Sequence, residues 1–158
     1  MRGTMIALEN AVILLIEDRD DDVLLVRKAL EKAELPNPVY VVKDGEEAIA
    51  YLSGEPPYST RSNHPLPDLI LLDLKMPKVD GFEVMTWIRN QSGIRAIPLV
   101  VLTSSEDLRD VNRAYALGAI SFLVKPLDFQ NPVELARVLH QYQQKFKLPQ
   151  TFRLPSQS

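Results

Sequence analysis

The 158-residue sequence contains no cysteine, which excludes disulfide bonds, thiolate metal ligands and a cysteine nucleophile. It has no apolar run approaching the ~20 residues of a membrane-spanning helix, and no signal-peptide pattern follows Met1. An excess of basic charge is missing too, because 18 Lys and Arg are set against 21 Asp and Glu. Since nucleic-acid binding needs a basic surface, we expect a cytoplasmic protein that binds neither nucleic acid nor membrane.

The sequence does contain five short, uninterrupted runs of Val, Ile and Leu. Continuous rather than alternating runs are typical of strands buried on both faces of a parallel sheet. The runs lie at residues 12–16, 39–42, 69–72, 99–102 and 122–124.

Helical patterns follow each of these runs. They cover about 20–33, 45–52, 81–90 and 106–118, and a last one contains Leu135, Leu139, Tyr142 and Phe146. Asp20, Asp21 and Asp22 give the first helix an acidic first turn, which suits the helix dipole. Asp44 is a candidate N-cap, and Gly118 is a C-terminal signal. Five strand–helix repeats predict a doubly wound α/β domain.

The length and composition indicate one domain. We expect residues 1–10 to form an N-terminal extension, residues 11–147 the domain, and residues 148–158 a C-terminal tail. The Pro-rich stretch 53–67 is expected to be an extended loop, with His64 exposed to solvent.

Polar residues follow four of the five predicted strands, and ligand sites in open α/β sheets form outside the carboxyl ends of strands. If the strand order is 2-1-3-4-5, these residues converge at one edge. Three clustered carboxylates repel one another, and a hard cation such as Mg²⁺ would neutralise them. An added lysine and hydroxyl suit a transferring phosphoryl group, with a carboxylate as nucleophile. The residues are Glu17, Asp18, Asp73, Thr103 and Lys125. Taken singly, each also fits an ordinary turn, cap or surface role.

In combination these residues resemble the receiver domain of two-component response regulators. The resemblance rests on Glu17-Asp18 after ILLI, DLILLDLKMPKVDG around Asp73, Thr103-Ser104 after LVVL, and Lys125-Pro126 after SFLV. It runs from about residue 12 to 146. It implies a flavodoxin-like (βα)5 fold with a five-stranded parallel sheet of order 2-1-3-4-5.

The family resemblance also implies roles for the acidic residues. Asp73 is expected to accept a phosphoryl group from a histidine-kinase phosphohistidine. Asp18 is expected to bind Mg²⁺ directly, with Glu17 acting through a bound water molecule or holding the cluster together. The Lys75 backbone carbonyl is expected to complete the site. The family's first acidic residue is most often Asp, so Glu17 should adjust this coordination rather than abolish it.

The resemblance implies a conformational switch as well. Thr103 would hydrogen-bond the phosphoryl group, Lys125 would pair with it, and Phe122 would move inward with Thr103. As a phenylalanine, Phe122 lacks the hydroxyl of the more common Tyr. The Lys125–Pro126 bond is a candidate cis peptide, and Gly81 is interpreted as supplying a backbone angle that other residues disfavour.

Two expectations concern partners. The Glu-Asp opening, the long loop and LDLKMPKVDG resemble the small single-domain regulators of cyanobacterial and other bacterial phytochromes, which implies a light-regulated histidine kinase as donor. Family members often dimerise through the helix at 106–118, the strand at 122–124 and the last helix. A homodimer is therefore expected through apolar and aromatic side chains on this face: Tyr115, Phe122, Leu135, Leu139, Tyr142 and Phe146.

The leading hypothesis is a phosphorylation-driven switch that signals by protein contact. It would not be a conventional enzyme, because its phosphotransfer and autodephosphorylation act on itself. A Mg²⁺-dependent phosphatase using Asp73 is one alternative, disfavoured because Lys75 stands where such enzymes carry a second Asp. A phosphorylation-independent interaction module is the other, disfavoured by the joint presence of Asp18, Asp73, Thr103 and Lys125.

Overall fold

The computed structural model describes residues 11–32, 34–35, 37–76, 79–103 and 108–125. The predicted terminal extensions, the last helix, and Pro126 with its candidate cis bond lie outside these residues. Within the described ranges the one cis peptide bond joins Pro56 and Pro57. No helix in this part of the chain is long and apolar enough to cross a bilayer.

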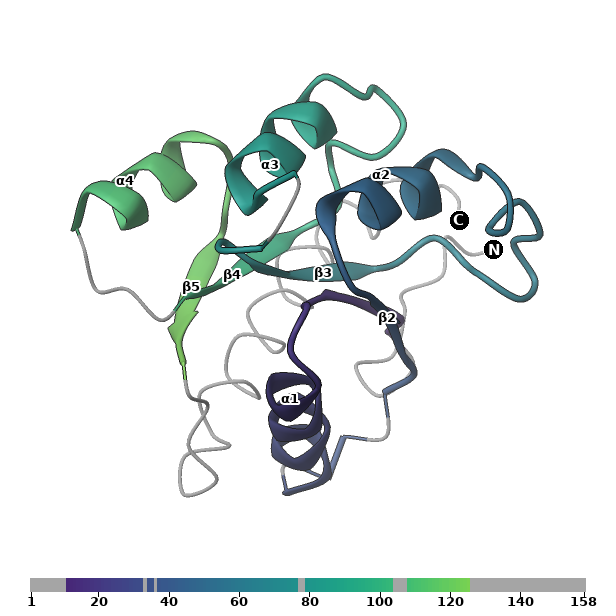
Figure 1. Ribbon diagram of the computed structural model, residues 1–158, viewed down its shortest axis with the longest axis horizontal. Helices are drawn as coiled ribbons and strands as arrows, with labels where there is room; N and C mark the ends of the chain where they lie inside the picture. The colour runs from purple at the N-terminus through teal and green to yellow at the C-terminus, as the bar shows by residue number, and fades with distance from the viewer. Residues whose placement is uncertain (1–10, 33, 36, 77–78, 104–107, 126–158) are drawn as a thin grey trace, which may run out of the picture.

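The centre of the molecule is a five-stranded parallel sheet of order β2-β1-β3-β4-β5 (Figure 1). This confirms the predicted flavodoxin-like strand order. The strands are β1 (Ile13–Ile16), β2 (Val39–Val42), β3 (Leu69–Asp73), β4 (Leu99–Thr103) and β5 (Ser121–Val124).

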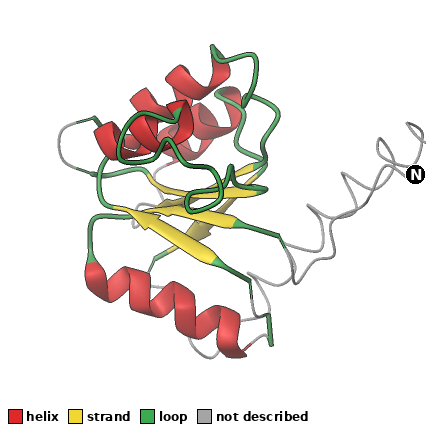
Figure 2. Cartoon of the chain, turned by 90° about the vertical axis from the view of Figure 1, so that its right-hand side faces the viewer, coloured by secondary structure: helices red, strands yellow, loops and turns green. Residues whose placement is uncertain are grey.

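Four described helices cover the two faces of the sheet. They are α1 (Asp20–Lys32), α2 (Gly45–Ser53), α3 (Gly81–Arg89) and α4 (Leu108–Ala116). Helices α2, α3 and α4 lie on one face and α1 lies on the other (Figures 1 and 2). The predicted cap of α2 is confirmed, because the Asp44 side chain accepts a hydrogen bond from the Glu47 N–H at 2.8 Å. Such caps stabilise a helix by about 1 kcal/mol.

The strands carry the hydrophobic core on both faces. Leu14 and Leu72 pack toward α2, α3 and α4, while Leu15 and Leu71 pack toward α1. Full burial of each such side chain contributes roughly 1.5–3 kcal/mol. The prediction of burial on both faces holds for β1 and β3. It is wrong for β2 and β5, which are only partly buried because they form the edges of the sheet.

The segment at 53–67 is held against α2 by specific contacts. The Arg61 guanidinium donates hydrogen bonds to the carbonyls of Tyr51 (2.8 Å) and Leu52 (3.0 Å), at the end of α2, and of His64 (3.2 Å). The predicted exposure of His64 is wrong. Its half-buried ring lies edge-on to Tyr51 and Tyr58, with centroid distances of 5.8 and 5.1 Å.

Candidate functional site

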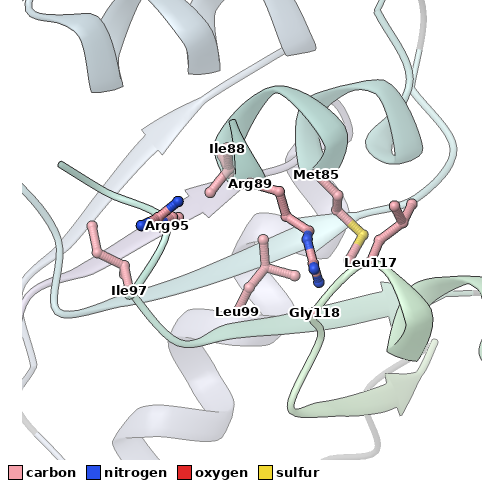
Figure 3. A pocket seen from close by; sticks show the side chains of 8 residues that line it. All are labelled: Met85, Ile88, Arg89, Arg95, Ile97, Leu99, Leu117 and Gly118. Atoms are coloured by element: carbon pink, nitrogen blue, oxygen red, sulfur yellow. The ribbon is translucent and has the colours of Figure 1, made fainter. Parts of the chain in front are cut away.

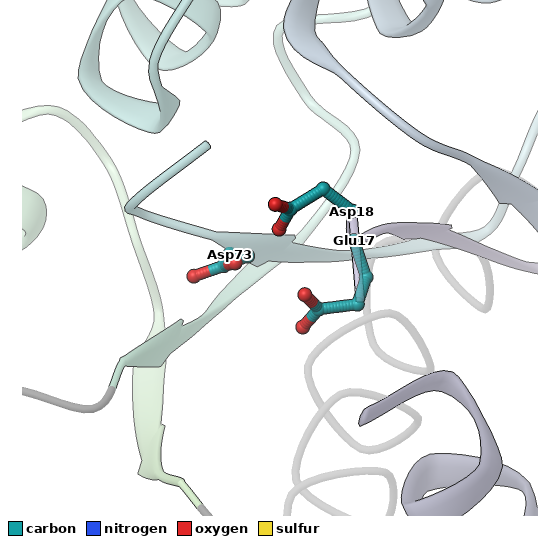
Figure 4. Close-up of side chains that lie close together, drawn as sticks. All are labelled: Glu17, Asp18 and Asp73. Atoms are coloured by element: carbon teal, nitrogen blue, oxygen red, sulfur yellow. The ribbon is translucent and has the colours of Figure 1, made fainter. Parts of the chain in front are cut away.

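The carboxyl ends of β1, β3 and β5 bring the predicted acidic residues and Lys125 to one place. Ile16 pairs with Leu72 in the parallel register, so Glu17 and Asp18 leave β1 beside Asp73, the last residue of β3. Figure 4 shows the two carboxyl groups from the end of β1 reaching toward Asp73. One oxygen from each of the three side chains lies within 4.8 Å of the others. The structure therefore forms the acidic cluster that the sequence predicts.

The two predicted switch residues lie on the neighbouring strands. Thr103 ends β4 and is paired in register with Val124 of β5. Phe122 is paired with Val101, two residues earlier. The half-buried Phe122 ring lies edge-on to the Tyr115 ring of α4, with centroids 6.1 Å apart. This contact joins β5 to α4, the two elements through which the switch is expected to act.

Lys125 places its ammonium group among carboxylates. Its Nζ atom lies 2.8 Å from Asp22 Oδ2, 2.9 Å from Glu17 Oε1 and 3.3 Å from Asp73 Oδ2. Its side chain is 10% exposed, and those of Glu17 and Asp73 are 0% and 4% exposed. Since a buried charge needs a partner, the lysine compensates part of the acidic charge of the cluster.

The electrostatics of the site follow from this burial. Burial raises the pKa of Glu17 to about 7, although Lys125 opposes the shift. Burial also raises the pKa of Asp73. Two contacts oppose this rise: the Lys75 backbone N–H, which donates to Asp73 Oδ1 at 3.1 Å, and the charge of Lys125. Burial lowers the pKa of Lys125, but the adjacent carboxylates of Asp22, Glu17 and Asp73 outweigh it and raise the pKa above its ordinary value. The cluster holds more negative charge than one ammonium neutralises.

The donor set fits a hard divalent cation. Asp18 Oδ1 is buried and has no hydrogen-bond partner within the described residues. With Glu17 and Asp73 it supplies carboxylate oxygens, the ligands that Mg²⁺ prefers. Lys75 lies two residues past Asp73, and the role of its carbonyl as a further ligand stays a prediction.

Asp22, predicted only to form part of the acidic first turn of α1, belongs to this cluster through its ion pair with Lys125. Helix α1 begins at Asp20, so Asp18 precedes it and helical spacing does not relate the two residues. Asp22 joins the cluster only because the fold brings Lys125, at the end of β5, to the first turn of α1.

A separate cavity of about 340 Å³ lies elsewhere in the fold (Figure 3). It is lined by apolar side chains of α3 and β4, together with Arg89 and Arg95. Leu99 begins β4 and Gly118 precedes β5, so the cavity lies at the opposite ends of these strands from the acidic cluster. None of its described lining residues is a carboxylate, and the cavity is separate from the acidic cluster.

The chain is similar in sequence to a family of signalling domains and to individual members of it. The family model described as the response regulator receiver domain matches residues 13–137. The chain is 36% identical over 131 residues to the probable methanogenesis regulatory protein FilR2 of Methanothrix harundinacea, covering 83% of this chain and 82% of that protein. It is 34% identical over 131 residues to response regulator Rcp1 of Synechocystis sp., covering 83% and 87%.

Solved structures show the same likeness. A structure of the Mn²⁺-bound form of Rcp1 has a TM-score of 0.70 at 34% identity and covers 83% of this chain and 92% of that one. The phosphorylated cyanobacterial phytochrome response regulator RcpA has a TM-score of 0.72 at 34% identity and covers 84% and 93%.

Proposed function

The chain belongs to the response regulator receiver domain family, and from this membership we propose that Asp73 accepts a phosphoryl group from the phosphohistidine of a histidine kinase. One observation carries the proposal. The Asp73 carboxylate ends the central strand β3 with the Lys125 ammonium 3.3 Å away and Asp18 of the acidic cluster beside it. A carboxylate nucleophile next to a cation is the arrangement that aspartyl-phosphate chemistry needs.

The reaction is a transfer between two side chains. An Asp73 oxygen forms a bond to phosphorus while the phosphorus–nitrogen bond of the phosphohistidine breaks. The imidazole nitrogen keeps the electron pair of that bond and takes a proton from solvent. Lys125 neutralises charge on the transferred group. Glu17, Asp18, Asp73 and the Lys75 carbonyl would hold Mg²⁺, which would supply further positive charge to offset that of the phosphoryl group.

Phosphorylation changes the charge at the carboxyl end of the sheet. It adds roughly −1.5 to −2 charge at pH 7 and three acceptor oxygens. We assign the response to Lys125 and to Thr103, which ends the neighbouring strand β4. The Phe122 ring and the Tyr115 ring against it would carry the change to α4.

Acetyl phosphate tests the acceptor directly. We expect a single Mg²⁺-dependent, base-labile phosphorylation by intact mass, present in the wild type and absent in Asp73→Asn. Asp21→Asn is a matched control, because Asp21 is an exposed carboxylate of α1. Phosphorylation at another residue, or none from either acetyl phosphate or a phosphorylated kinase, would favour the phosphorylation-independent module. Steady release of phosphate from added monoesters would favour the phosphatase.

We propose a light-regulated kinase as the donor, because the similar protein RcpA is a phytochrome response regulator. Phosphotransfer from a purified bacterial phytochrome kinase should then be much faster than from a histidine kinase with an unrelated sensor. Equal rates from both kinases would count against a phytochrome partner and leave Asp73 as the acceptor.

A homodimer through α4 and β5 is also proposed. Tyr115 is 45% exposed and Val124 is 37% exposed on these elements, and both are large apolar side chains. Tyr115→Arg should convert the dimer to a monomer in light scattering, whereas Leu24→Arg, at an exposed leucine of α1, should not. A wild type that stays monomeric at all concentrations, with and without phosphorylation, would remove the dimer.

A further inference from the structure

Among the described residues, the shortest ion-pair distance of Lys125 is to Asp22 of α1, not to the acceptor Asp73. The Lys125 Nζ atom lies 2.8 Å from Asp22 Oδ2 and 3.3 Å from Asp73 Oδ2. An ammonium group has three hydrogens to donate and no acceptor. Three carboxylates surround this one, with Glu17 as the third at 2.9 Å. Lys125 forms ion pairs with all three and donates a hydrogen bond to Asp73.

We propose that Asp22 is a positioning residue that holds the Lys125 ammonium beside Asp73 from helix α1. The proposal rests on the function proposed for Asp73. When Asp73 becomes phosphorylated, Lys125 exchanges its contact with that carboxylate for a phosphoryl oxygen, while its contact with Asp22 persists. The lysine then meets the phosphoryl group from a fixed position.

Burial and backbone geometry support this role for Asp22. A lysine carries its ammonium group on a flexible four-carbon stem. Fixing the rotamers of that stem costs conformational entropy. The Asp22 side chain is only 15% exposed. It stands on a helical turn closed by the Asp22 N–H to the Arg19 carbonyl at 3.1 Å, and Arg19 Nε lies 3.5 Å from Asp22 Oδ2. Asp22 is therefore a fixed anchor for a side chain that is otherwise mobile.

A role in helix stabilisation alone would make Asp22 interchangeable with Asp21, the adjacent carboxylate of the same turn. If Asp22 served only as a first-turn carboxylate favoured by the helix dipole, replacing Asp21 would have the same effects as replacing Asp22. Asp21 is exposed and adjacent, so Asp21→Asn removes the same charge without touching Lys125. The two substitutions separate positioning from helix stabilisation.

The first test needs no metal and no phosphorylation. Reductive methylation with formaldehyde and a borohydride, read by peptide mass spectrometry, measures the access of reagent to Lys125. We expect severalfold faster modification of Lys125 in Asp22→Asn than in the wild type or Asp21→Asn, with the exposed Lys75 as internal reference. In Asp22→Glu, which keeps the charge, the rate of Lys125 modification should lie between those of the wild type and Asp22→Asn. Equal Lys125 rates in Asp22→Asn and Asp21→Asn would overturn the proposal; should Asp22→Asn not fold, a wild-type rate in Asp22→Glu would do so.

The second test asks whether Asp22 acts through Lys125 on cation binding. Without Asp22, Lys125 pairs more closely with Glu17 and Asp73 and competes with the cation for them. Free Mn²⁺ counted by electron paramagnetic resonance should show roughly threefold to tenfold weaker binding in Asp22→Asn. The same substitution in a Lys125→Met background should change binding less than about twofold. An equal loss in both backgrounds would mean that Asp22 acts by its charge alone, and would overturn the proposal.

The two proposals fail separately. Suppose that Asp22 protects Lys125 from methylation but Asp73 is never phosphorylated. This result would remove the proposed function and keep the positioning role of Asp22. Phosphorylation of Asp73 with Lys125 labelled equally in all variants would keep the function and remove the role of Asp22.

Discussion

Gly81, the first residue of α3, is packed directly on the backbone of Asp73. A Cβ atom added to Gly81 would lie 2.7 Å from the Asp73 carbonyl oxygen and 2.6 Å from the Cα of Leu74. The interpretation that Gly81 supplies an unusual backbone angle is wrong, because the positive-φ glycines of the described chain are Gly54 and Gly118. Glycine is needed at 81 because helix and strand approach each other closely at the acceptor.

Gly81→Ala should therefore both destabilise the protein and displace the acceptor. We expect a loss of about 1–3 kcal/mol in urea unfolding, typical of overpacking, and slower phosphorylation by acetyl phosphate.

Gly93→Ala is the matched control, because a Cβ there meets nothing within 4 Å. Its unfolding free energy should stay the same or rise by up to about 1 kcal/mol. Equal stability of the two variants would contradict the packing argument.

Divalent cations should stabilise the folded protein. Glu17, Asp18 and Asp73 repel one another, so a cation that binds only the folded site raises the unfolding free energy. At ten times the dissociation constant of Mg²⁺ the gain is about 1.4 kcal/mol. Thermal unfolding with Mg²⁺, then with excess chelator, measures it.

Asp18→Asn should lose most of this gain, because Asp18 Oδ1 is a buried carboxylate oxygen of the cluster that has no hydrogen-bond partner among the described residues. Sodium chloride at matched ionic strength controls for screening. A gain that Na⁺ reproduces, or that Asp18→Asn retains, would argue against a specific site.

Arg61 should anchor the 53–67 segment through its planar guanidinium. It reaches three carbonyls, two of them at the end of α2. A lysine has the charge but lacks the planar fork. Arg61→Lys and Arg61→Ala should both cost roughly 1.5–3 kcal/mol and open the segment to limited proteolysis. Wild-type stability in Arg61→Lys would show that charge alone is sufficient.

Alkaline pH should destabilise the protein through two tyrosines. Burial raises the pKa of both Tyr51 and Tyr58 from 10.0 to about 12. Both phenols release protons more readily in the unfolded chain. The stabilisation is thus complete below about pH 10 and is lost as the pH rises toward about 12.

Urea unfolding across that range should show the decline, with the buried Tyr51 contributing up to about 1.4 kcal/mol per pH unit. Phenolate absorbance gives the ionisation directly. Tyr51→Phe keeps the ring and should flatten the decline; an unchanged slope in that variant would exclude Tyr51 as its source.

The sequence by itself determined the five strands, the four described helices and their order along the chain, because those depend on local patterns. Continuous apolar runs indicated buried strands, and Asp44 marked the start of α2. The acidic residues and Lys125 were placed together because parallel strands end at the same edge. Three further features depend on contacts between segments far apart in sequence: the ion pair of Asp22 with Lys125, the burial of His64 and the reason for Gly81. Only the tertiary structure decided these, because a pattern along one segment does not contain the atoms of another that packs against it.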